Sequence, residues 1–159
     1  MAVAKRRNWV ILAYRLPREP STPRISVWRK LKTLGVAQLL DGLAALPLTP
    51  RSREQLEWLA DEVLEAGGES SIWIAQAATV AQERDLVEGM AEAIAQEYRS
   101  LADRAEGAET GQPDGRRRSL GRFRRQMHRI RQRDYFPPPE REAAVEAIKR
   151  LAEVAEGRS

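Results

Sequence analysis

The densest chemical signal in the sequence is a run of arginines near its C-terminal end. Residues 116–133 contain nine arginines and no acidic residue. Guanidinium groups donate paired hydrogen bonds to phosphate oxygens and to guanine edges, so this pattern is typical of a nucleic-acid contact. The candidate DNA contacts in this segment are Arg116, Arg117, Arg118, Arg122, Arg124, Arg125, Arg129, Arg131 and Arg133.

The charge distribution leaves a second interpretation of these arginines open. The formal net charge is +4, but it divides into +8 over residues 1–35, −11 over residues 36–115 and +7 over residues 116–159. Two basic segments favour binding to a polyanion. The alternative is that the arginines pair with carboxylates of the acidic middle segment and lie on an ordinary solvated helix.

Two smaller basic groups lie near the N-terminus. The second candidate DNA surface consists of Arg24, Arg29, Lys30 and Lys32, with a basic arm formed by Lys5, Arg6 and Arg7. A Pro-rich loop leads into the helix that carries this surface, and helix N-termini favour anions. The candidate residues for a tetrahedral oxyanion such as sulfate are Arg18, Ser21, Thr22 and Arg24. Ordinary helix capping beside solvated arginines is the alternative there.

Composition argues against most enzyme classes. The chain has no cysteine and a single histidine, His128, which removes thiolate nucleophiles and thiolate metal sites and argues against histidine-based catalysis. We therefore expect no enzyme, no catalytic residue, no metal and no cofactor. Because no apolar run approaches the roughly 20 residues of a membrane helix, we expect a soluble, cytoplasmic protein without a membrane partner.

Hydrophobic periodicity predicts the order β-α-β-β-α-β within residues 9–76. This order is that of the ferredoxin-like fold, an α+β architecture with two helices on one face of a four-stranded sheet. Asp41-Gly42 predicts a hairpin turn with positive φ at both residues, and Thr22 is the expected cap of the first helix. The predicted strands are 9–16, 36–40, 43–46 and 71–75, and the predicted helices are 23–34 and 50–66.

The four tryptophans fall one each in the first strand, both helices and the last strand. Large aromatic residues spread in this way are expected to fill the layer between helices and sheet, and stacking of nucleic-acid bases is the alternative. The residues are Trp9, Trp28, Trp58 and Trp73.

Residues 80–159 are predicted to form a C-terminal α-helical extension behind a ferredoxin-like core of residues 1–79. Its first helix is expected at about 83–104, with one apolar and one acidic face. A flexible linker is expected at 107–115, followed by an amphipathic basic helix at about 116–135 and a last helix from Glu140. The expected inward positions of the basic helix are Leu120, Phe123, Met127 and Ile130, and those of the last helix are Ala144, Ile148, Leu151 and Ala155.

Three segments carry a family resemblance. Residues 14–47, YRLPREPSTPRISVWRKLKTLGVAQLLDGLAALP, resemble the signature of the ChrB family of chromate-resistance proteins. Residues 51–68 (RSREQLEWLADEVLEAGG) and 131–147 (RQRDYFPPPEREAAVEA) resemble the same family, so the similarity covers most of the chain. Members of that family are typically longer, and we expect this chain to correspond to their N-terminal region.

The resemblance implies a chromate-responsive, DNA-binding transcriptional regulator of a chromate-efflux operon. Its partners would be operator DNA and, at the oxyanion site, chromate or its analogue sulfate; a homodimer is left open. A fainter resemblance connects the chain to PaaX-type repressors and to CRISPR-associated ferredoxin-like nucleases. Those nucleases hold a cation with an aspartate near the end of strand one, where this chain has Tyr14 and Arg15. The alternative function is a non-catalytic protein-interaction or oxyanion-sensing module that does not bind DNA.

Overall fold

The computed structural model describes residues 6–157. Its contacts divide the chain into two compact units, Met1–Gly89 and Met90–Ser159. We describe each unit by itself. The domain boundary after residue 79 stays a prediction.

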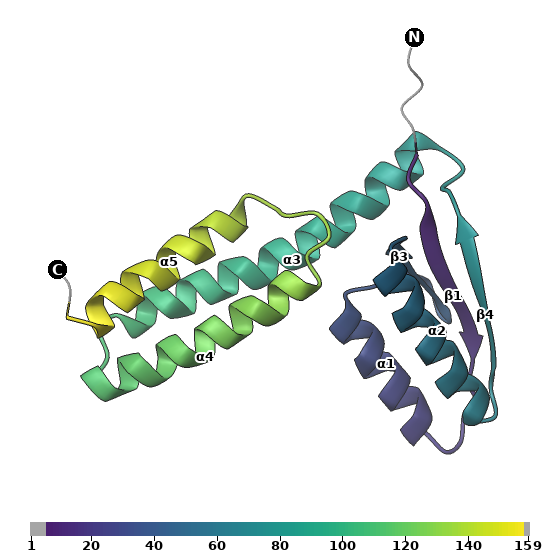
Figure 1. Ribbon diagram of the computed structural model, residues 1–159, viewed down its shortest axis with the longest axis horizontal. Coiled ribbons are helices and arrows are strands. Elements are labelled where there is room, and N and C mark those ends of the chain that lie inside the picture. The colour runs from purple at the N-terminus through teal and green to yellow at the C-terminus, as the bar shows by residue number, and fades with distance from the viewer. Residues whose placement is uncertain (1–5, 158–159) are drawn as a thin grey trace, which may run out of the picture. The chain divides into compact units, whose positions relative to one another are not determined.

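The first unit is a four-stranded antiparallel sheet with two helices on one face (Figure 1). The α+β class and the element order agree with the sequence analysis. Strands run in the spatial order β2-β3-β1-β4, so β1 is paired on both sides. The elements are β1 (Trp9–Arg15), α1 (Thr22–Leu34), β2 (Ala37–Leu40), β3 (Leu43–Pro47), α2 (Pro50–Glu65) and β4 (Glu69–Ala75).

A capping box starts α2. The Ser52 backbone N–H donates to Thr49 Oγ1 at 2.9 Å, and the Thr49 N–H donates to Ser52 Oγ at 2.9 Å. Ser52 Oγ also donates to the Pro47 carbonyl at 2.7 Å, which ties the end of β3 to the start of α2. These bonds satisfy amides that would otherwise lack partners in the first helical turn, and they leave Ser52 buried.

The predicted burial of the four tryptophans is wrong for three of them. Trp9 is buried, whereas Trp28, Trp58 and Trp73 are 52%, 64% and 60% exposed. In α1 the pair Val27 and Leu31 faces the sheet, so Trp28 lies outside the buried stripe.

Strand alternation explains the position of Trp73 in β4. Ser70 Oγ donates to the Ala60 carbonyl of α2 at 2.8 Å, so Ser70 points toward the helices. Since side chains alternate along a strand, Trp73 lies on the opposite face of the sheet.

The hairpin between β2 and β3 also differs from the prediction. Only Gly42 has positive φ, at 76°, and no non-glycine residue of the described chain does, Asp41 included. A register irregularity between Gln38 and Leu40 supplies local bending in β2. The turn therefore does not require the costly left-handed conformation at Asp41.

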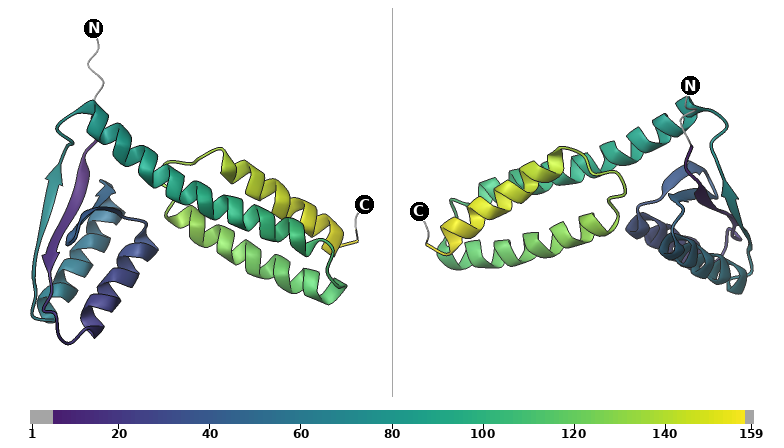
Figure 2. Two further views of the ribbon diagram at one scale, coloured as in Figure 1. Left: turned by 180° about the vertical axis from the view of Figure 1, so that it is seen from behind. Right: turned by 45° about the horizontal axis from the view of Figure 1, so that its top comes forward.

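The second unit contains the remaining helices, which lie side by side (Figure 2). They are α3 (Val80–Ala108), which begins in the first unit, α4 (Pro113–Gln132) and α5 (Glu140–Ala155). The linker expected at 107–115 is shorter, because α3 continues to Ala108 and Pro113 occupies the first turn of α4. All four inward positions predicted for α4, and all four for α5, are buried.

None of the helices between residues 6 and 157 combines the length and apolarity that crossing a membrane would require.

Gly42 provides a test of the hairpin. A Cβ at this position would collide with the Tyr14 carbonyl oxygen, whereas a Cβ at Gly67, which has a similar φ of 85°, would meet no atom within 4 Å. We expect Gly67→Ala to cost about 1–2 kcal/mol of unfolding free energy through φ alone, and Gly42→Ala to cost more. Tryptophan fluorescence during denaturation measures this in the first unit, which contains all four tryptophans. Equal losses would show that the approach to Tyr14 is unimportant.

Candidate nucleic-acid interface

The orientation of α4 is set by its apolar stripe. Leu120, Phe123, Met127 and Ile130 belong to one buried cluster with residues of α3 and α5. Among them Ile130 is completely inaccessible to solvent. Positions spaced by three and four share one side of a helix, so the intervening arginines must lie on the other sides.

The arginines opposite this stripe form a continuous row. Arg118, Arg122, Arg125 and Arg129 are spaced by four, three and four residues, and all are exposed. At 1.5 Å of rise per residue the row extends over about 16 Å. The exposed residues Arg117, Arg124 and Arg131 lie beside it.

Most of these arginines have no carboxylate partner among the described residues. The alternative interpretation, in which the arginines pair with carboxylates of the acidic middle segment, holds for Arg133. Its guanidinium contacts Glu97 of α3. Arg117 lies 3.9 Å from Asp114 of its own helix, and both side chains are more than two-thirds exposed. Such exposed pairs contribute little, about 0–1 kcal/mol. Within residues 6–157, no ion pair is formed by Arg118, Arg122, Arg124, Arg125, Arg129 or Arg131.

Two arginines of the segment make local contacts. Arg116 Nη1 donates to the Gly111 carbonyl at 3.0 Å, near the start of α4. The Arg122 guanidinium lies 5.2 Å from the centroid of the Phe123 ring, and its Nη2 donates to Ser119 Oγ at 3.3 Å. Arg116 is therefore held at the helix start, while Arg122 remains exposed.

Some acidic residues of α3 pair with basic residues outside α4. Arg99 contacts Glu92 at 2.7 Å and Glu140 at 3.3 Å. The hydrogen bond from Arg99 lowers the pKa of Glu92, and the same bond raises the pKa of Arg99. Arg7 pairs with Glu83 at 3.6 Å. Some of the carboxylates that could have paired with the arginines of α4 are therefore paired with other basic residues.

A buried polar contact fixes the end of α4, and sequence reasoning did not single it out. Tyr98 Oη on α3 donates to Asp134 Oδ2 at 2.7 Å, and Arg141 Nη1 lies 4.0 Å from the same oxygen. The Asp134 side chain is fully buried. Burial, followed by the hydrogen bond to Asp134, raises the pKa of Tyr98. The sequence did contain a signal for the burial of Tyr98, because Ile94, Tyr98 and Leu101 are spaced on one face of α3.

Two lysines of the second candidate DNA surface contact other side chains of the chain. Lys30 Nζ contacts Glu62 Oε1 of α2 at 2.5 Å, and Lys32 Nζ lies 4.6 Å from the Trp28 ring centroid. Arg29 is exposed and forms no ion pair in the described chain. Arg6 Nη1 donates to the Ala77 carbonyl at 3.0 Å, and Lys5 lies outside the described residues.

The four candidate oxyanion residues lie in and before the first turn of α1. Arg18, Ser21, Thr22 and Arg24 are all exposed. The expectation that Thr22 caps α1 is wrong, because Ser21 occupies the cap position in a right-handed helical conformation without a side-chain capping bond. Oxyanion binding here stays a prediction.

The end of β1 has no arrangement typical of a cation site. Arg15 Nη2 pairs with Glu69 Oε2 at 2.9 Å. Burial, with a contribution from Asp41, raises the pKa of Tyr14. No group of three or more His, Asp or Glu residues that could hold a metal ion occurs within residues 6–157.

The structure thus defines a chain with an α+β unit and a helical unit that exposes an arginine face. A family model described as "Protein ChrB, N-terminal" matches residues 24–110, which is more than half of the chain. The chain therefore belongs to the ChrB family, as the resemblance predicted. The matched residues end before α4.

A curated relative agrees with this assignment. The chain is 35% identical over 97 residues to Protein ChrB of Cupriavidus metallidurans (strain ATCC 43123 / DSM 2839 / NBRC 102507 / CH34). The match covers 61% of this chain and 26% of that protein, so it spans about a quarter of the relative's length. No solved structure matches the chain.

Tyr98→Phe tests the contact that fixes the end of α4. Removal of the hydroxyl leaves buried Asp134 without this donor, so we expect a loss of about 1–3 kcal/mol in unfolding free energy at neutral pH, measured by circular dichroism. Because the folded-state pKa of Tyr98 is raised, its contribution is complete below about pH 10 and is lost as pH rises above that value. The unmodified chain should therefore lose stability more steeply there than Tyr98→Phe. Parallel pH profiles would contradict this assignment.

Proposed function

We propose that this chain is a chromate-responsive, DNA-binding transcriptional regulator of a chromate-resistance efflux operon, and that α4 contacts the operator. The observation that carries the proposal is the exposed arginine face of α4. Most of its guanidinium groups lack a carboxylate partner in the described structure, while the opposite face is held in the core. Membership of the ChrB family supports the connection with chromate resistance.

The geometry of α4 suits a duplex. A single α-helix fits the major groove of B-DNA, and arginine is the commonest side chain that reads guanine there. In this proposal the row Arg118, Arg122, Arg125 and Arg129 faces the DNA, and the flanking arginines neutralise phosphates. Each neutralised phosphate releases counterions, so affinity would fall steeply with salt.

We also propose that the first unit is ferredoxin-like. Strands β1 and β2 both pair antiparallel with β3, so they are parallel to each other with β3 between them. In the same way, β3 and β4 are parallel with β1 between them. These two split β-α-β units with both helices on one face support that assignment.

The proposed role is non-catalytic and requires no cofactor. Arg15, at the end of β1, would repel a divalent cation at the position where the CRISPR-associated ferredoxin-like nucleases bind one, and it pairs with Glu69. A regulator of this kind would act in the cytoplasm, where its operator lies. Chromate would act as the effector by binding preferentially to the DNA-free form, which shifts the equilibrium away from the operator.

The function is tested by replacing Arg118, Arg125 and Arg129 together with glutamine. We expect weaker binding to DNA from upstream of its own operon, because three guanidinium groups of the proposed contact are lost. If each contacts one phosphate, the slope of log affinity against log salt should become shallower by about 0.9 per arginine. Fluorescence anisotropy across a salt series measures both quantities, with and without chromate.

The matched control removes the same charge elsewhere. Arg51, Arg84 and Lys149 are exposed and form no ion pair in the described chain, so their combined replacement by glutamine should change affinity much less. Equal effects of the two triple variants would contradict a specific role for α4. Binding to a protein without any binding to duplex DNA would favour the alternative, a non-catalytic interaction module.

A further inference from the structure

The outer face of α2 carries an acidic and aromatic row. Glu54, Trp58, Asp61 and Glu65 are spaced by four, three and four residues, so they share one side of the helix. All four side chains are exposed, and the inward face of α2 packs on the sheet through other residues. None of the three carboxylates forms an ion pair with a described residue.

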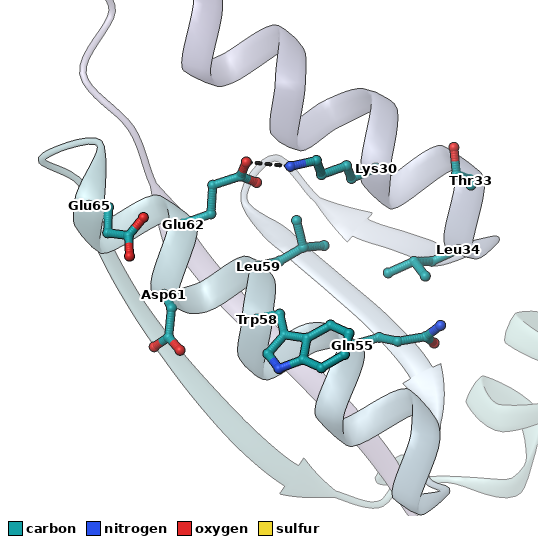
Figure 3. A pocket seen from close by; sticks show the side chains of 9 residues that line it. All are labelled: Lys30, Thr33, Leu34, Gln55, Trp58, Leu59, Asp61, Glu62 and Glu65. Carbon is teal, nitrogen blue, oxygen red and sulfur yellow. Dashed lines mark hydrogen bonds and ion pairs between the residues drawn. The ribbon is translucent and has the colours of Figure 1, made fainter.

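A groove between α1 and α2 borders this row (Figure 3). Its apolar lining includes Leu34 and Leu59, and Trp58 lies along it. Lys30 is the basic residue of the lining, and Glu62 neutralises it at 2.5 Å. Asp61 and Glu65 therefore give the groove a net negative charge. An exposed indole beside carboxylates favours a guanidinium, which can stack on the ring and pair with the acids.

The complementary feature is present in the same chain. The row Arg118, Arg122, Arg125 and Arg129 of α4 has the same spacing of four, three and four residues. The spacing is the same from either end of a row. Each residue of one row can therefore lie opposite a residue of the other row, whether the two helices run parallel or antiparallel. Three arginines would face three carboxylates, and the fourth would face Trp58.

We propose that the α2 row of one copy of this chain binds the α4 row of a second copy. Each copy carries both rows, so a two-fold dimer would contain the contact twice. Tryptophan and arginine are the residue types that most often dominate interface energies. The dimer would cover the same arginines that we assign to DNA, so self-association and DNA binding would compete. The inference does not depend on the proposed function.

The first test reverses the charge of α2. The double variant Asp61→Lys, Glu65→Lys should self-associate at least about tenfold more weakly than the unmodified chain in sedimentation equilibrium at low salt. Trp58→Ala should weaken it as well, through loss of the ring. The matched control is Glu146→Lys, Glu153→Lys on α5, which should retain self-association. It makes the same charge change at exposed residues that form no ion pair with a described residue. Circular dichroism verifies that each variant is folded.

The second test uses charge complementation. In the parallel arrangement Arg125 and Arg129 face Asp61 and Glu65, and in the antiparallel arrangement Arg122 and Arg118 face them. The variants Arg125→Glu, Arg129→Glu and Arg118→Glu, Arg122→Glu should each also self-associate more weakly alone. An equimolar mixture of Asp61→Lys, Glu65→Lys with the arginine variant that matches the true arrangement should form a heterodimer, because both contacts then pair opposite charges. A heterodimer that forms only in the mixture supports the proposal. An unmodified chain that is monomeric at every concentration tested, or the absence of a heterodimer in both mixtures, would overturn it.

These outcomes are separate from those of the DNA experiment. Asp61→Lys, Glu65→Lys leaves every arginine of α4 intact, so its DNA affinity should be retained or increased. Loss of self-association with retained DNA binding therefore supports the dimer contact, whatever the outcome for Arg118, Arg125 and Arg129.

Discussion

Burial of the apolar stripe of α4 constrains where its arginines can lie. Leu120, Phe123, Met127 and Ile130 enter the core of the helical unit, and rotation of α4 would expose them. Fully burying such a side chain contributes roughly 1.5–3 kcal/mol, more than an exposed ion pair contributes. The packing therefore decides the orientation of the helix, and the arginine face follows from it.

The contacts around α4 reinforce this orientation and leave most of its arginines without a carboxylate partner among the described residues. At its C-terminal end the Tyr98–Asp134 hydrogen bond and the Arg133–Glu97 pair connect the chain to α3. Nearer the start of α3, Glu92 pairs with Arg99 of the same helix rather than with α4. The protein thus combines a fixed helix with a solvated row of guanidinium groups, which suits reversible binding to a polyanion or to an acidic protein surface.

Sequence periodicity identified the element order and the inward faces of α4 and α5. In each of these two helices the apolar residues repeat along a single face, so no second face could be mistaken for the inward one. Periodicity failed at Trp28 of α1, because Trp28 repeats with Leu31 at helical spacing, and only packing on the sheet shows that Val27 and Leu31 are the buried pair. The linker was overestimated because the polar residues of 107–115 resemble a loop, although Ala108 and Pro113 belong to helices. Periodicity predicted that the arginines lie on one face but could not show which have carboxylate partners, since that depends on residues distant in sequence.

The absence of native cysteine allows the central claim to be tested with one chemical probe. A cleavage reagent, iron chelated by EDTA, can be attached through a single cysteine at His128→Cys, among the exposed arginines of α4, or at Glu153→Cys, on the exposed face of α5. If α4 contacts the operator, hydroxyl radicals from the α4 probe will cut bound duplex DNA at a few adjacent nucleotides, and the α5 probe will cut weakly or diffusely. Localised cutting from the α5 probe, without cutting from the α4 probe, would contradict the account.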